Sequence, residues 1–130
     1  MSTDQAELTQ ALAFLYIAAA QATDGTLTPD EMRTLASKLQ ERAPELSLDD
    51  LGMVLRQTVG AYKAIGTLEE KLERAHAHAQ MLRDAIDEPL RKAIVDDLLA
   101  IARADGRVSD EEVAFIGTIA MKMGLYGKEG

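Results

Sequence analysis

Residues 17–32 read IAAAQATDGTLTPDEM, and residues 98–113 read LLAIARADGRVSDEEV. The two stretches align without a gap at an offset of 81 residues. Each contains an apolar, Ala-rich segment, an Asp-Gly pair, a Ser or Thr, and a Glu three positions after that Ser or Thr. Glycine suits the end of one helix, and Ser or Thr followed by Glu suits the start of the next. Each stretch therefore predicts a helical hairpin.

The sequence around these stretches predicts four further helix boundaries. Apolar residues recur at helical spacing in every segment, and strands are disfavoured by the low aromatic content of 4%. Capping residues, or a proline in the first turn, mark the six expected starts: Ser2, Thr28, Ser47, Thr67, Pro89 and Ser109. We therefore expect a compact all-α bundle of about six helices. The first and second helices, and the fifth and sixth, would form two pseudo-repeated Asp-Gly hairpins about a pseudo-two-fold axis.

Composition sets the size and the general class of the protein. A chain of 130 residues with 47% apolar content fits one globular domain. We expect this domain to span residues 1–125. The chain should fray from Gly124 onward, with residues 126–130 as a flexible C-terminal tail.

Several classes of function are disfavoured by the same composition. The chain has no cysteine, which removes thiol nucleophiles and thiolate metal sites and suits a reducing cytoplasm. A formal charge of −8 makes nucleic acid a poor partner. The longest apolar run, residues 11–20, is too short to cross a bilayer, and we expect neither a signal peptide nor membrane insertion.

Four acidic residues occupy equivalent positions in the two hairpins: Asp24, Glu31, Asp105 and Glu112. Four carboxylates brought together would suit Ca²⁺, Mg²⁺ or Mn²⁺, because these cations prefer oxygen ligands. The Asp-Gly-to-Glu spacing matches the second half of an EF-hand loop. The first half fails, because non-ligating residues stand at the first and third loop positions: Ala20, Ala22, Ile101 and Arg103.

The same residues also have a purely structural interpretation. Gly25 and Gly106 suit positions where a helix ends with a positive φ angle, and the two repeated glutamates suit capping boxes. Aspartate is in addition a common turn residue beside glycine. Arg107 places a positive charge next to the second Asp-Gly pair, which disfavours tight cation binding there. Both interpretations stay open.

Two other polar pairs give weaker signals. His76 and His78 are two positions apart, whereas a chelating helical pair needs a spacing of four. We expect both to be solvent-facing, and no zinc site. Asp96 and Asp97 are adjacent charges, which normally mark a solvated helix face.

The segments ATDGTLTPDE and ARADGRVSDEE, each after an Ala-rich apolar helix, resemble the tellurite-resistance TerB-like domains. That family includes the related N-terminal domain of the DnaJ-like co-chaperone DjlA. The resemblance covers about residues 11–125. It implies an all-helical fold, divalent-cation binding through acidic residues, and a place in bacterial responses to tellurite and other stresses.

The sequence contains no phosphate-binding loop, dinucleotide fingerprint or nucleophile elbow, so we expect neither an enzyme nor an organic cofactor. We expect a stress-associated binding module with weak acidic divalent-cation binding. The alternative is a protein–protein interaction module whose Asp-Gly turns are structural and bind no metal. The partner protein is not identified by the sequence.

Overall fold

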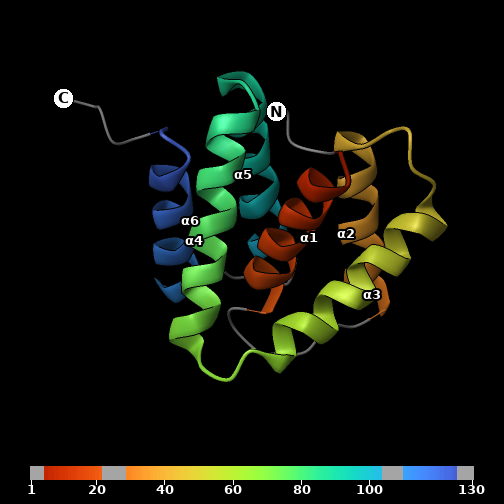
Figure 1. Ribbon diagram of the computed structural model, residues 1–130, viewed down its shortest axis with the longest axis horizontal. Helices are drawn as coiled ribbons and strands as arrows, with labels where there is room; N and C mark the ends of the chain where they lie inside the picture. Colours follow the sequence, from red (N-terminus) through yellow and green to blue (C-terminus); the bar gives the residue numbers. More distant parts are fainter. Residues whose placement is uncertain (1–4, 22–28, 104–109, 126–130) are drawn as a thin grey trace.

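Six helices make up the regular structure of the residues that the computed structural model describes, which are 5–21, 29–103 and 110–125. They are α1 (Gln5–Gln21), α2 (Pro29–Arg42), α3 (Leu48–Ala64), α4 (Leu68–Ala85), α5 (Glu88–Arg103) and α6 (Asp110–Lys122) (Figure 1). These described segments contain no strand, and the predicted all-α fold is confirmed.

Capping side chains define three of the helix starts. Ser47 and Thr67 each accept the backbone N–H of the residue three positions later, both at 3.1 Å, as the sequence predicts. Asp87 does the same before α5, where its Oδ1 accepts the N–H of Leu90 at 3.2 Å. This third cap was not predicted. The expected caps Thr28 and Ser109 lie outside the described residues.

Helix α1 lies at the centre of the bundle. Every residue from Ala11 to Ala19 is buried, and the helix packs against all five others. A helix that is apolar on every side must be surrounded by protein or lipid. None of the described helices is long and apolar enough to cross a membrane. The apolar run at residues 11–20 therefore serves as the central element of the core.

The six helices form two antiparallel pairs, α1/α2 and α5/α6, and one V-shaped pair, α3/α4 (Figure 1). Helices α1 and α5 run in one direction through the middle, while α2 and α6 return on opposite flanks. Helices α3 and α4 form the V, with α3 packed on α1 and α2, and α4 packed on α1, α5 and α6. Their buried residues recur at helical spacing, as expected for helices that bury one face. These residues are Leu51, Leu55 and Tyr62 on α3, and Ala75, Ala79 and Leu82 on α4.

The end of α6 differs from the expected frayed tail. Gly124 has a φ angle of +78°, its N–H donates to the carbonyl of Met121, and the N–H of Leu125 donates to that of Ala120. This is a Schellman ending, in which two otherwise unpaired helix carbonyls accept hydrogen bonds. Arg91 of α5 adds a third bond, from Nη1 to the carbonyl of Met123 at 2.8 Å. The prediction of fraying at Gly124 and Leu125 is therefore wrong. Residues 126–130 lie outside the described chain.

Candidate functional site

The predicted ion site lies mainly outside the described part of the chain. Asp24 and Asp105 belong to segments that the structure does not describe, as do the side chains of Glu31 and Glu112. The backbones of the two glutamates are described. Each is the third residue of its helix, α2 or α6, which is the position required of a capping-box glutamate.

The helix ends that flank the four carboxylates share one end of the molecule (Figure 1). Helices α1 and α5 both finish there, at Gln21 and Arg103, and α2 and α6 both begin there, at Pro29 and Asp110. Helices α1 and α5 are also in direct contact. Within the described residues, no group of three or more His, Asp or Glu side chains could hold a metal ion.

A buried polar network connects three helices in the middle of the domain. Asp97 of α5 accepts a hydrogen bond from the hydroxyl of Tyr16 on α1. Arg42, the last residue of α2, donates to both carboxylate oxygens of Asp97, from Nε at 2.9 Å and from Nη2 at 3.1 Å. The side chain of Asp97 is 7% exposed, and that of Arg42 is 20% exposed. A bidentate arginine–carboxylate pair is among the strongest polar contacts in proteins.

Asp97 therefore corrects the prediction of a solvated acidic pair, because it is buried whereas Asp96 is exposed. The sequence contained a signal for this difference. Asp97 lies three positions after Ile94 and four before Ile101, both of which face the core. A carboxylate on that stripe must be buried, and a buried carboxylate needs a partner.

The electrostatics of this network favour a structural role over a catalytic one. Burial raises the pKa of the Tyr16 hydroxyl, and the hydrogen bond to Asp97 raises it further. The hydrogen bond to Asp97 also raises the pKa of Arg42. Tyr16 therefore keeps its proton and Arg42 its charge. Since both oxygens of Asp97 accept hydrogen bonds within the fold, the network holds α1, α2 and α5 together.

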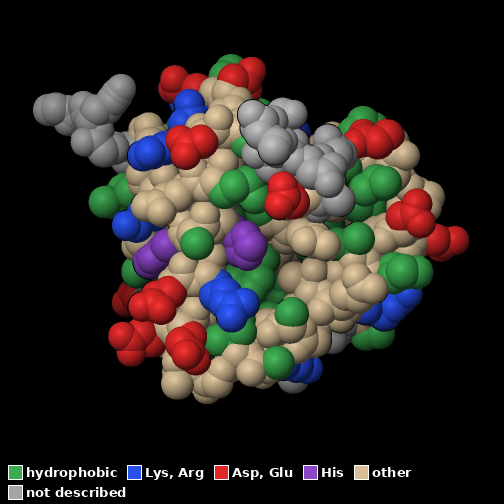
Figure 2. Space-filling view, viewed as in Figure 1, with side chains coloured by type: hydrophobic (Ala, Val, Ile, Leu, Met, Phe, Trp, Pro, Cys, Tyr) green, Lys and Arg blue, Asp and Glu red, His purple; other side chains and the backbone are tan. Residues whose placement is uncertain are grey.

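The two histidines lie on one face of the molecule (Figure 2), and the prediction that both are solvent-facing is correct only in part. Both are only partly exposed. The ring of His78 packs against Phe14 of α1, with 4.8 Å between ring centroids. Burial lowers the pKa of both histidines, with a further lowering from Lys122 at His76 and from Arg74 at His78.

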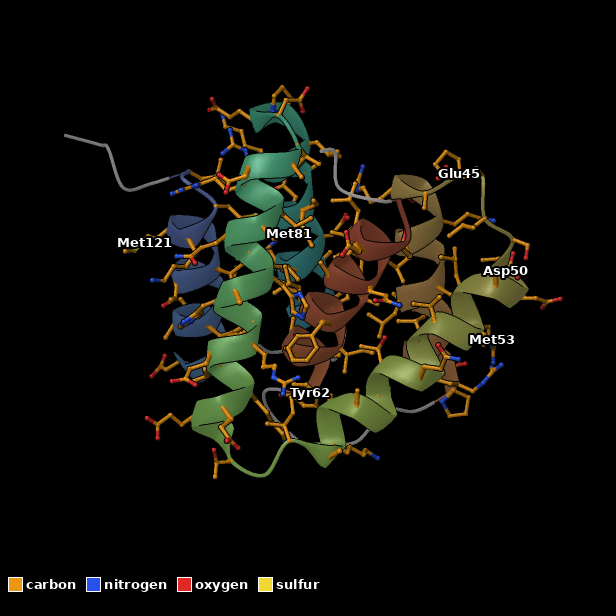
Figure 3. All side chains as sticks on the ribbon, viewed as in Figure 1. Glu45, Asp50, Met53, Tyr62, Met81 and Met121 are labelled. Atoms are coloured by element: carbon orange, nitrogen blue, oxygen red, sulfur yellow. The ribbon has the colours of Figure 1, made fainter. Side chains whose placement is uncertain are left out.

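An apolar groove of about 480 Å³ runs between α2 and α3. Its lining includes Met32 and Ala36 from α2, and Leu48 and Leu55 from α3. Leu48 is 50% exposed. Two methionines are exposed outside the groove, Met53 on α3 and Met121 on α6. They lie on opposite flanks of the molecule (Figure 3). The groove was not predicted, because it depends on how two helices pack together.

Comparison with known proteins gives one match. The family model described as "Tellurite resistance protein TerB" matches residues 9–129, which is almost the whole chain. No curated protein matches the chain, and no solved structure matches it.

Proposed function

Because the chain belongs to the tellurite resistance protein TerB family, we propose that it is a stress-associated module that binds divalent cations weakly through Asp24, Glu31, Asp105 and Glu112. The ion would be Ca²⁺, Mg²⁺ or Mn²⁺, since the ligands offered are oxygens. The proposal includes a bacterial cytoplasmic setting, which the absence of cysteine suits. It is a proposal of binding and not of catalysis.

One observation carries the proposal. The two glutamates have the same position in helices that begin at the same end of the bundle, where α1 and α5 also finish (Figure 1). Two equivalent Asp-Gly segments connect these helix ends. This arrangement puts the helix ends of both hairpins at one end of the bundle, with α2 and α6 beginning on its opposite flanks (Figure 1). The N-termini of α2 and α6 would attract the same carboxylates without a metal, so an experiment must separate ligation from capping.

The test compares Glu→Gln variants, because glutamine can still cap a helix but carries no charge. The double variant Glu31→Gln/Glu112→Gln should fold like the parent but lose the stabilisation by cations. At about 100 times the dissociation constant, a bound ion adds roughly 2.7 kcal/mol to the free energy of unfolding. Thermal melts with chelator and with millimolar Ca²⁺, Mg²⁺ or Mn²⁺ measure this effect.

Glu70→Gln is the matched control. Glu70 is the third residue of α4 and follows the cap Thr67, but it has no neighbouring Asp-Gly pair. This variant should keep the full response to cations. If the parent does not respond to any of the three cations, or the double variant responds as strongly as the parent, the metal proposal fails.

The groove between α2 and α3 favours a second candidate function, a protein–protein interaction module without a metal. Its floor includes Gly52, in the interior of α3, where glycine costs roughly 1 kcal/mol relative to alanine. The fold does not require this glycine, since an added Cβ would meet only Nη1 of Arg56, at 3.5 Å. A side chain at this position would add volume to the lining of the groove. A partner that docks there should lose affinity for Gly52→Ala.

A further inference from the structure

We propose that a second cavity, between α1, α3 and α4, binds a small organic anion with a planar apolar body, such as an aromatic carboxylate. The cavity has a volume of about 270 Å³ and shares no lining residue with the α2/α3 groove. The proposal goes beyond the cation-binding function. The residues that would make the site are Gln10, Phe14, Gln57, Thr58, Arg74 and His78.

The charges around the cavity favour an anion. The chain has 22 acidic and 14 basic residues, yet among the described residues no carboxylate lines this cavity. Arg74 and His78 are one helical turn apart on α4 and both line it. The positive charge of Arg74 lowers the pKa of His78, after the larger effect of burial. An anion at this cavity would pair with a guanidinium that forms no ion pair with any described residue.

Arg74 has hydrogen-bond donors to offer. It forms neither a hydrogen bond nor an ion pair with any residue in the described segments. Glu70 and Glu73 border a neighbouring depression that Arg74 also lines, but neither carboxylate pairs with its guanidinium. A guanidinium binds a carboxylate through two parallel hydrogen bonds. The side-chain amides of Gln10 and Gln57 lie at the same cavity and can donate as well.

The remaining wall of the cavity suits a flat apolar group. Phe14 packs on His78 at 4.8 Å between ring centroids, and edge-on against Tyr62 at 5.4 Å, so its ring is held in place. Val54 and Ala61 of α3 add apolar surface. The cavity thus combines one apolar wall with several polar groups. Such a wall fits an aromatic carboxylate better than an inorganic oxyanion, which has no apolar part to bury.

Figure 2 shows this face of the molecule. A histidine and a basic side chain lie close together near its middle, with hydrophobic side chains beside them. Acidic side chains are visible on this face above and below the pair as well as at the edges.

The experiment titrates the full chain with benzoate and follows the imidazole signals of His78 and the ring signals of Phe14 by NMR. We expect saturable chemical-shift changes for the parent. Arg74→Gln should bind benzoate at least tenfold more weakly, which corresponds to a loss of about 1.4 kcal/mol of binding free energy. The fold should tolerate this substitution because Arg74 is exposed and unpaired within the described residues. Arg56→Gln, at an exposed arginine in the other groove, is the control and should bind like the parent.

A second variant tests the cavity without changing its charge. Ala61→Leu, at an exposed position in α3, should fill the cavity from its rim and also weaken binding. Benzamide, which has the same ring without the charge, should bind much more weakly than benzoate, and inorganic phosphate should not reproduce the Phe14 shifts. The proposal is overturned if benzoate gives no saturable shift up to about 50 mM. Equal binding of benzamide or of phosphate, or an unchanged affinity in Arg74→Gln, would overturn it too.

Discussion

The hydroxyl of Tyr16 donates a hydrogen bond to Asp97, and these two residues are 81 positions apart, the offset that aligns the two Asp-Gly segments. Equivalent positions of the two hairpins therefore meet where α1 and α5 cross. A two-fold relation between the hairpins would have its axis beside this contact. We predict that the two hairpins superpose with Tyr16 placed on Asp97, and this superposition would test the relation directly.

Substitution of Asp97 should destabilise the domain far more than substitution of its neighbour. Asp97→Asn removes the charge that Arg42 pairs with in the interior, whereas Asp96 is exposed. Breaking a fully buried pair costs roughly 3 to 5 kcal/mol. Since Arg42 is 20% exposed, we expect Asp97→Asn to lower the free energy of unfolding by about 2 kcal/mol. Asp96→Asn should lower it by less than about 0.5 kcal/mol. Urea unfolding measures both, and similar values for the two variants would show that the buried pair does not stabilise the fold.

The domain should lose stability as the pH falls from about 7 to about 5. Burial lowers the pKa of His76 and His78 in the folded state, so the unfolded chain, with a histidine pKa near 6.5, binds more protons in this range. Protonation of the two histidines therefore favours the unfolded chain. The domain regains its stability as the pH rises through 6.5.

Urea midpoints at the two pH values measure this effect, and a double His76→Gln/His78→Gln variant is the control. The double variant should show a flatter dependence than the parent. An identical slope in both proteins would mean that other groups account for it.

Two glycines of α3 should be replaceable by alanine with a gain in stability. A Cβ at Gly60 would meet nothing within 4 Å, and one at Gly52 would meet only the flexible end of Arg56, at 3.5 Å. Each substitution should add roughly 0.5 to 1 kcal/mol to the free energy of unfolding, because alanine favours the helix more. Only Gly52→Ala should affect a partner in the α2/α3 groove, which makes Gly60→Ala its matched control. A loss of stability at either site would contradict the packing described above.

In contrast to these two substitutions, Gly124→Ala should lower the stability of the domain. Gly124 has a φ angle of +78°, where alanine is strained, and an added Cβ would lie 3.2 Å from Cδ of Arg83. It would also approach Nη1 of Arg91, which donates to the carbonyl of Met123. We expect a loss of about 1 kcal/mol or more in thermal or urea unfolding. Unchanged stability would mean that the Schellman ending of α6 contributes little.

The sequence by itself determined the helices, and local chemistry explains why. Caps such as Ser47 and Thr67 pair with backbone groups only three residues away, so their effect can be recognised without knowing the fold. The apolar spacing within each helix likewise identified most of the buried faces of α3, α4 and α5. The repeated positions of Glu31 and Glu112 are also local, and both were placed in the correct helical position.

Only the tertiary structure decided which polar side chains enter the core and which cavities form between helices. Adjacent helical residues point about 100° apart, so Asp96 and Asp97 differ in burial only because α1 and α2 cover one side of α5. The partner Arg42 lies 55 residues from Asp97 along the chain, and no local pattern connects them. The anion cavity and the α2/α3 groove arise in the same way, from side chains of separate helices that meet only when the bundle packs.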